Sequence, residues 1–167
     1  YSDYGTTLYG NEIVFASARD TGSLGQRKHK WTNQHFTNLY SATLGEDMTP
    51  GKTQKFDANI KSRFNESTPI FSKDGKTIYF TRNNFLDGKK GKDANKVTLI
   101  KIYKATLENE KWTKITELPF NSDNYSVAHP ALSPDGNTLY FASDMPGTLG
   151  QSDLFKVKIN SDGTYGT

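Results

Sequence analysis

The stretch AHPALSPDGNTLYFAS, from Ala128 to Ser143, decides the fold of this chain. Within it, Asp135-Gly136 separates two apolar runs, and an Asp-Gly pair in that setting is the strongest short-range signal for a β-hairpin. Pro130 opens the first run, where a missing backbone N–H is tolerated. We therefore predict two antiparallel strands joined by a two-residue turn at Asp135-Gly136.

The same pattern occurs three times along the chain. The second copy is STPIFSKDGKTIYFTR at 67–82, and the first is YGTTLYGNEIVFAS at 4–17. Each copy is followed by another apolar segment: LYSATL at 39–44, IYKATL at 102–107 and LFKVKI at 154–159. Repeats of this length indicate an array of similar structural units rather than one irregular domain.

Each unit is predicted to be β throughout, with four strands. The second strand, Ile78-Tyr79-Phe80 or Leu139-Tyr140-Phe141, is apolar on both faces, whereas a half-exposed strand would alternate. The segment from Trp112 to Glu117 supplies a fourth, outer strand in the second unit. Burial on both faces is expected when each small sheet lies between two neighbouring sheets.

These features predict an all-β fold made of β-propeller blades, each with four antiparallel strands. A β-sandwich of two similar halves is the alternative, but it would need more alternation and no third repeat. About three blades are expected: blade 1 at about 4–57, blade 2 at about 66–117 and an incomplete blade 3 at about 127–167. A closed ring needs four to eight blades, so we expect a longer chain with about six, or self-association through the open blade faces.

The repeat resembles the WD-like repeat of TolB-type periplasmic propellers, through Ser133-Pro134-Asp135-Gly136, Ser72-Lys73-Asp74-Gly75 and the segment 152–155. The segments 1–5, 14–20 and 31–40 are similar to the propeller region of OmpA-family outer-membrane-associated lipoproteins of Bacteroidetes. The resemblance implies a periplasmic location at the outer membrane, envelope proteins as partners and a role in secretion or gliding machinery. That family's peptidoglycan-binding domain has no counterpart in these residues, so the resemblance assigns them no peptidoglycan binding.

Composition excludes several other functions. The 167 residues contain no cysteine, which excludes disulfides and thiolate metal sites but does not fix the compartment. The net charge of +3 is small for a nucleic-acid-binding surface, so no nucleic acid is expected as a partner. No apolar stretch is long enough to span a membrane. No cofactor and no metal site are predicted.

The longest loops are expected on one face of the blades, at about 18–38, 58–67, 83–99 and 118–127, and long loops on a rigid scaffold commonly carry function. The candidate binding residues on and beside these loops are Arg19, Arg27, His29, Trp31, His35, Arg63, Arg82, Tyr125, His129 and Asp144. Two alternatives stay open. Trp31 and Phe36 either present a binding surface or fold back over the blade edge. His129 either faces a central channel or is a hydrogen-bonded structural residue.

No enzyme signature stands out. A Gly-x-Ser-x-Gly nucleophile pattern is absent, and Ser72-Lys73-Asp74-Gly75 lacks the spacer and the Trp of a sialidase box. We therefore expect a non-catalytic protein-interaction scaffold of the cell envelope. The alternatives are a propeller that binds carbohydrate or peptidoglycan fragments and a glycoside hydrolase, for which Asp123, Asp144 and Glu66 are the carboxylates to test.

Overall fold

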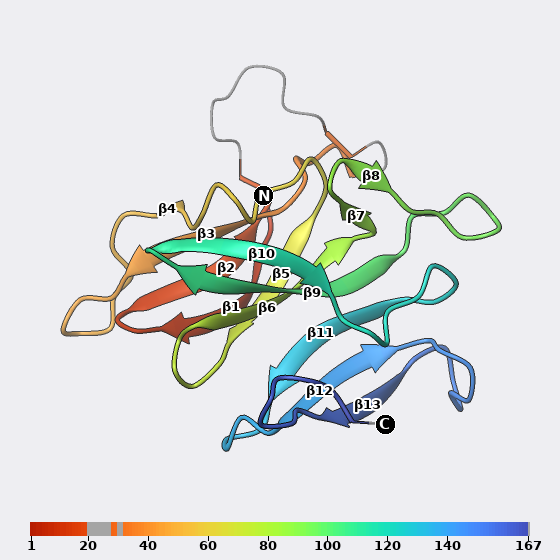
Figure 1. Ribbon diagram of the computed structural model, residues 1–167. Helices are drawn as coiled ribbons and strands as arrows, with labels where there is room; N and C mark the ends of the chain where they lie inside the picture. The colour runs from red at the N-terminus through yellow and green to blue at the C-terminus, as the bar shows by residue number, and fades with distance from the viewer. Residues whose placement is uncertain (20–27, 30–31, 167) are drawn as a thin grey trace.

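The computed structural model describes residues 1–19, 28–29 and 32–166, and these form antiparallel β-sheets with no helix among them (Figure 1). The all-β prediction is confirmed. Because the described part of the chain contains no helix, it also contains none that could cross a membrane.

The first two sheets each have four strands, as predicted. The first has the order β1-β2-β3-β4, and the second has the order β10-β9-β6-β5. The strands of the first sheet are β1 (Asp3–Tyr9), β2 (Glu12–Ser17), β3 (Asn38–Thr43) and β4 (Gln54–Lys55). Those of the second are β5 (Glu66–Phe71), β6 (Thr77–Asn83), β9 (Ile100–Glu108) and β10 (Lys111–Glu117).

The third sheet has three strands, in the order β11-β12-β13. They are β11 (Val127–Leu132), β12 (Thr138–Ser143) and β13 (Asp153–Lys158). A single bridge between Ile159 and Tyr165 follows, where a fourth strand would start. A small hairpin of β7 (Phe85–Leu86) and β8 (Lys89–Lys90) lies in the loop after β6 and was not predicted.

The predicted two-residue turns are wrong in length. Between β5 and β6, the Ser72 N–H donates to the Thr77 carbonyl at 2.9 Å, which leaves four residues in the loop. The Ser72 hydroxyl accepts the Thr77 N–H at 2.9 Å, and Asp74 accepts the Lys76 N–H at 3.0 Å. These side chains take the place of backbone acceptors, so a longer loop is stable. Asp135 lies in an equivalent loop between β11 and β12.

Each first strand contains a β-bulge with one residue at positive φ. Gly5, Thr68 and His129 have φ values of 64°, 43° and 56°, and the strand register shifts at each of them. Pro69 and Pro130 follow two of these residues, so they lie inside their strands and not at the start, contrary to our prediction. A bulge interrupts the hydrogen-bond ladder, and a proline that lacks an N–H is tolerated there.

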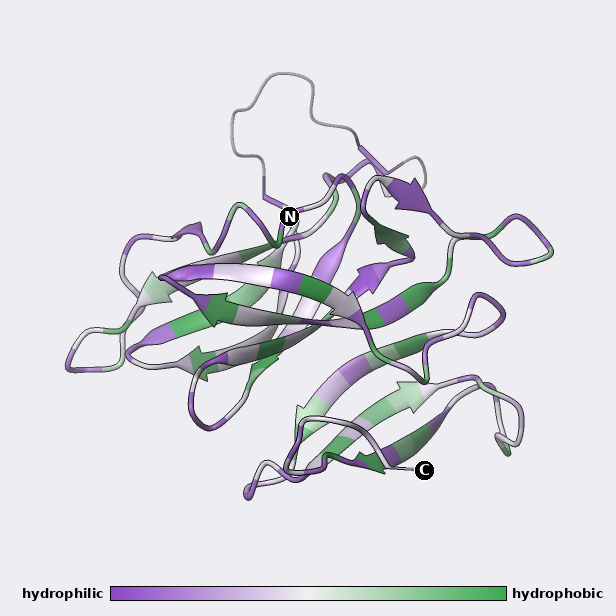
Figure 2. Cartoon of the chain, in the orientation of Figure 1, coloured by the Kyte–Doolittle hydropathy of each residue, from purple (hydrophilic) through white to green (hydrophobic). Residues whose placement is uncertain are grey.

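The three sheets pack against each other in chain order (Figure 1). Strand β5 packs against β1, β2 and β3 of the first sheet, while β11 packs against β5, β6 and β9 of the second. The two-sided burial predicted for the second strand is confirmed in β6, where Ile78, Tyr79 and Phe80 are all buried. One apolar cluster around Phe80 joins the first two sheets, and another around Tyr79 joins the second and third. Figure 2 shows hydrophobic segments on the strands of all three sheets.

Candidate functional site

A cavity lies where the first strands of the sheets meet. We call it the histidine pocket, because His29, His35 and His129 all line it, together with Thr81 and Arg82. Its volume is about 370 Å³. Four of the candidate residues, the three histidines and Arg82, therefore line one cavity.

The bulges position the wall of this pocket. The Thr68 and Thr81 hydroxyls are 2.8 Å apart, and the His129 N–H donates to the Thr81 hydroxyl at 3.0 Å. Gly5 continues the row, because a Cβ on it would lie 3.1 Å from the Thr68 Cα. Gly5 therefore lies against Thr68 of the next sheet, and Thr68 is connected to His129 of the third sheet through the Thr81 hydroxyl.

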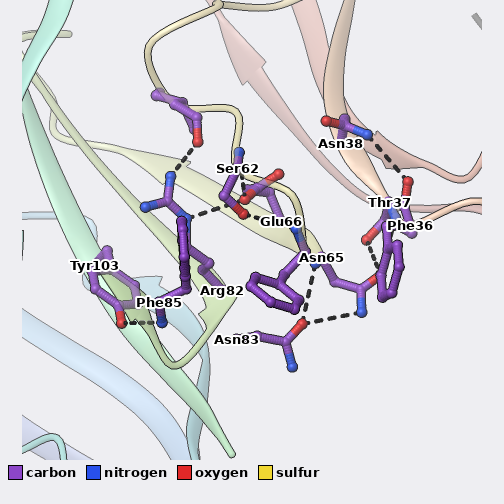
Figure 3. A network of polar contacts seen from close by, with 12 residues as sticks. Phe36, Thr37, Asn38, Ser62, Asn65, Glu66, Arg82, Asn83, Phe85 and Tyr103 are labelled. Atoms are coloured by element: carbon purple, nitrogen blue, oxygen red, sulfur yellow. Dashed lines mark hydrogen bonds and ion pairs between the residues drawn. The ribbon is translucent and has the colours of Figure 1, made fainter. Parts of the chain in front are cut away.

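A buried ion pair lies behind the pocket. The Arg82 Nε donates to Glu66 Oε1 at 3.1 Å, and the two side chains are 4 % and 0 % exposed. The guanidinium also lies over the rings of Phe80 and Tyr103, and it donates to the Ile60 carbonyl. Figure 3 shows Arg82 between the Glu66 carboxyl and Tyr103. Arg82 was predicted to be a surface binding residue, but its charge is engaged inside the protein.

Burial dominates the electrostatics of the pair. It raises the pKa of Glu66 from 4.5 to about 7, although Arg82 and the Ser62 N–H favour the charged carboxylate. Burial likewise lowers the pKa of Arg82. The Glu66 carboxyl therefore carries a proton in a substantial fraction of molecules at neutral pH.

Three asparagines form hydrogen bonds beside the ion pair, and one of them, Asn65, connects the first two sheets (Figure 3). Asn83 Oδ1 accepts the backbone N–H of Asn65 at 3.1 Å and its side-chain amide at the same distance. The Asn65 Oδ1 accepts the Thr37 N–H at 3.0 Å. Asn38 donates its side-chain amide to the Phe36 carbonyl at 3.1 Å. These bonds hold the start of β3 against the β5–β6 hairpin.

A second cavity, of about 200 Å³, opens on the other side of Glu66. We call it the Glu66 cavity. Its lining residues are Asn38, Leu39, Asp57, Ala58, Ile60 and Glu66, together with the exposed Lys55 and Lys61. Glu66 Oε1 accepts the Ser62 N–H at 3.0 Å in addition to Arg82, whereas Oε2 is buried without a hydrogen-bond partner. Asn38 Oδ1 is also buried without a partner.

The remaining predicted residues are dispersed. Arg19 pairs with Asp3 at 3.1 Å and lies over the ring of Tyr40. Arg63 is exposed, with its guanidinium 5.9 Å from the Phe85 ring centre. The Tyr125 hydroxyl donates to the Phe120 carbonyl, and Asp144 accepts the Ser126 N–H at 2.6 Å. Arg27 and Trp31 lie outside the described residues. Phe36 folds back, since its ring packs edge-on against Phe64.

Each of the carboxylates named for hydrolysis is bonded to a partner of its own. Glu66 is held by Arg82, Asp144 by the Ser126 N–H, and Asp123 by Lys101 at 2.8 Å and by Asn84. Lys101 and Asn84 lower the pKa of Asp123. No group of three or more His, Asp or Glu side chains within the described residues could hold a metal ion.

Sequence reasoning missed the Glu66–Arg82 pair and the free oxygen of Asn38. The available signal was a Glu at the start of a strand that ends in the apolar run Pro69-Ile70-Phe71, since a buried carboxylate requires a partner. Asn38 gave no signal, because an Asn before an apolar strand is common at loop ends.

The described residues thus define an all-β protein of tandem antiparallel sheets, with a pocket between their first strands. No family model and no curated protein matches the chain. Among solved structures, it is similar to a puromycin-hydrolyzing peptidase of Mycobacterium tuberculosis, with a TM-score of 0.55 and 15 % sequence identity. The match covers 96 % of this chain but 21 % of the peptidase, so the chain spans about a fifth of that protein. At this identity the likeness concerns the fold alone.

Proposed function

We propose that the three sheets are consecutive blades of a β-propeller, and that this region is a non-catalytic protein-interaction scaffold of a cell-envelope protein. The observation that carries the proposal is a difference between equivalent positions of the repeat. Tyr79 and Ile102 of the second sheet are 5 % and 0 % exposed, because the third sheet covers them. Their equivalents in the third sheet, Tyr140 and Leu154, are 43 % and 85 % exposed.

The third sheet therefore exposes side chains whose equivalents in the second sheet are buried. Covering Leu154 as fully as Ile102 would contribute about 2 kcal/mol, and a sheet that packs there would gain this from several side chains. Large apolar side chains that are exposed at positions which the preceding sheet buries indicate a surface of association. A further blade, from a longer chain or from a second copy, would cover the face.

A periplasmic location at the outer membrane, and partners among envelope proteins, are part of the same proposal. The resemblance of the repeat to TolB-type and OmpA-family proteins supports them. The long loops lie at the same end of the sheets as the histidine pocket. They are part of the surface available for partners, because they are held by rigid strands.

The open face is tested by sedimentation of the purified chain over a range of concentrations. We expect concentration-dependent association, and we expect Leu154→Glu to abolish it without lowering the free energy of unfolding. Ile102→Glu is the matched variant at the equivalent buried position, and it should unfold the protein. A wild-type chain that stays monomeric at about 100 µM and binds no apolar dye would contradict the proposal.

The envelope role is tested by fractionation of cells that produce the tagged, full-length protein, followed by cross-linking. Recovery with outer-membrane material, together with envelope proteins, is the expected result. Recovery in the cytoplasm would overturn this part of the proposal and leave the blade assignment standing.

The likeness to a peptidase favours one second candidate, which is a segment of a larger hydrolase. The peptidase is described as puromycin-hydrolyzing, so release of the amino acid from puromycin is the assay. We expect no turnover by this chain. Turnover that is lost when Asp123 or Asp144 is changed to Asn would establish the second candidate instead.

A further inference from the structure

We propose that the basic side chains on and beside the β7–β8 hairpin form a docking surface for an acidic segment of a partner protein, with Arg63 and Lys90 at its centre. We call it the basic hairpin surface, and it consists of Arg63, Lys89, Lys90 and Lys92. The inference names the kind of partner that the scaffold takes, so it rests on the proposed function. It concerns a loop of the second sheet and not the open face of the third.

The hairpin is anchored to the second sheet. Its two strands are joined by Asp87-Gly88, where φ is 49° and 78°, and a type I′ turn requires positive φ at both residues. At its base, the Gly91 N–H donates to the Asn84 carbonyl at 3.0 Å. The Phe85 N–H donates to the Tyr103 hydroxyl at 3.2 Å, which connects β7 to β9. The charges on the hairpin are therefore held in place before a partner binds, which lowers the entropic cost of binding.

Two of the cations are positioned by aromatic rings. The Lys90 Nζ lies 5.2 Å from the ring centre of Phe64, and the Arg63 guanidinium lies 5.9 Å from that of Phe85. The two rings pack edge to face, with their centres 5.1 Å apart. A cation is attracted to the face of an aromatic ring. Because the rings are neighbours, Arg63 and Lys90 are held beside one another.

The charge of the basic hairpin surface is not neutralised by the protein itself. Its four side chains are exposed and have no ion-pair partner within the described residues, whereas Arg82 and Lys101 are paired with carboxylates. Asp87 is the acidic residue of the hairpin, and Asp93 beyond it accepts the Val97 N–H at 2.7 Å. The surplus of positive charge attracts a negatively charged partner and orients it on approach.

The hairpin favours a protein segment over a membrane or a nucleic acid. The turn at its tip, Asp87-Gly88, is negatively charged and has no apolar side chain that could enter a bilayer. Phe85 and Leu86 are half-buried, and Figure 2 shows that the hydrophobic residues are in β7 while β8 is hydrophilic. Membrane-surface sites combine basic residues with exposed apolar ones, and nucleic-acid sites need a denser basic surface than a chain of net charge +3 supplies.

The hairpin is also an insertion into one unit of the repeat. It lies in the long loop at 84–99, between β6 and β9. The equivalent loop of the third sheet, at 144–152 between β12 and β13, is shorter and has no strand, no Lys and no Arg. Insertions into single repeats are commonly found on the binding face of a repeat protein.

The test follows the fluorescence anisotropy of a short labelled peptide of alternating Glu and Ser, at about 0.05 M and about 0.15 M salt. A peptide of alternating Gln and Ser and vesicles that contain phosphatidylglycerol are the comparison probes. We expect saturable binding of the Glu peptide that weakens with salt, and no binding of the Gln peptide. Tighter binding to the vesicles, or no saturable binding at the lower salt concentration, would overturn the proposal.

The double variant Arg63→Gln/Lys90→Gln removes the two central charges. One exposed ion pair contributes up to about fivefold in affinity, so we expect the dissociation constant of the Glu peptide to rise at least about fivefold. Lys73→Gln/Lys76→Gln is the matched control, because both lysines are exposed in the β5–β6 loop, at the other end of β6. It removes the same charge and should change the dissociation constant less than about twofold. Equal losses would show a diffuse effect of charge and contradict the docking surface.

Gly91→Ala tests the arrangement of the charges without removing any of them. A Cβ on Gly91 would overlap the side chain of Asn84, which is buried and donates to Asp123, so the base of the hairpin must shift. We expect the dissociation constant to rise about twofold to tenfold, because the cations must then be ordered on binding. Gly150→Ala is the matched control with open space around it, and it should bind as the wild type does. Unchanged binding by Gly91→Ala would refute a preformed site.

Failure of the proposed function has a different result. Association through Leu154 should persist in Arg63→Gln/Lys90→Gln, because the open face belongs to the third sheet. A wild-type chain that stays monomeric and still binds the Glu peptide would contradict the open blade face and leave the basic hairpin surface standing.

Discussion

The buried carboxyl of Glu66 makes the stability of the protein depend on pH between about 5 and 8. Its pKa is 4.5 when exposed and about 7 in the folded protein, so the folded state favours the protonated form. The contribution of this group is therefore complete below pH 4.5 and is lost as pH rises through about 7. The difference between the two pKa values, at about 1.4 kcal/mol for each pKa unit, gives about 3 kcal/mol.

The perturbation is Glu66→Gln, which removes the titration. Urea unfolding at pH 5, 6, 7 and 8 gives the free energy of unfolding of each protein. We expect the difference between wild type and variant to change by about 2 to 3 kcal/mol across this range, with the wild type losing stability relative to the variant as pH rises. All other side chains are identical in the two proteins, so their effects cancel in the difference.

A direct measurement supports the same test without a variant. The side-chain carbonyl signal of Glu66, followed by NMR, should titrate near pH 7 rather than near 4.5. Parallel pH profiles of the two proteins, or a midpoint below pH 5 for this signal, would refute the reasoning. The Arg82 charge would then outweigh the desolvation that burial imposes.

Three further substitutions test the contacts between the sheets. Gly5→Ala combines a positive φ with a Cβ 3.1 Å from the next sheet, so it should lower the free energy of unfolding in urea clearly more than Gly10→Ala does. Gly10 has φ 60° and open space around it, and its change to Ala should cost about 1 kcal/mol. Equal losses for the two variants would contradict the bulge contact. Thr81→Val removes the acceptor of the His129 N–H, and we expect it to lower the free energy of unfolding by about 1 to 3 kcal/mol. An unchanged midpoint of urea unfolding would show that water replaces the hydroxyl. Trp112→Ala removes a buried ring from the aromatic cluster that joins the first two sheets, and it should lower the free energy of unfolding by about 3 to 5 kcal/mol. A loss of less than about 1 kcal/mol, measured by calorimetry, would exclude a central role for this cluster.

The strands themselves could be predicted from the sequence because their signals are local. Ile78, Tyr79 and Phe80 are consecutive apolar residues, which indicates burial on both faces of the strand, and the structure buries all three. The Asp-Gly pairs gave the positions of the hairpins for the same reason. Their loop length was wrong, because the Ser72 hydroxyl replaces a backbone group in the ladder, which composition does not reveal.

The candidate site was predicted less well. His29, His35 and His129, which were named as candidates from the sequence, line one cavity in the structure. Arg82 was predicted to be a surface residue, but a long cationic side chain can turn inward when a buried carboxylate is present to pair with it. Glu66 and Arg82 are 16 positions apart in the chain, and no local sequence pattern shows that their side chains are bonded.

Local sequence alone determined the strands, their repeat and their antiparallel pairing, because hydrophobic periodicity and turn chemistry act over a few residues. Only the tertiary structure decided which side chains meet inside. An unbroken ladder through Ile70 and Tyr79 would set Glu66 opposite Asn83, and the bulge at Thr68 shifts the register by one residue so that Glu66 lies opposite Arg82. A shift of one residue exchanges the faces of a strand, so a single backbone angle, stabilised by contact with the neighbouring sheets, determines where the buried charge lies.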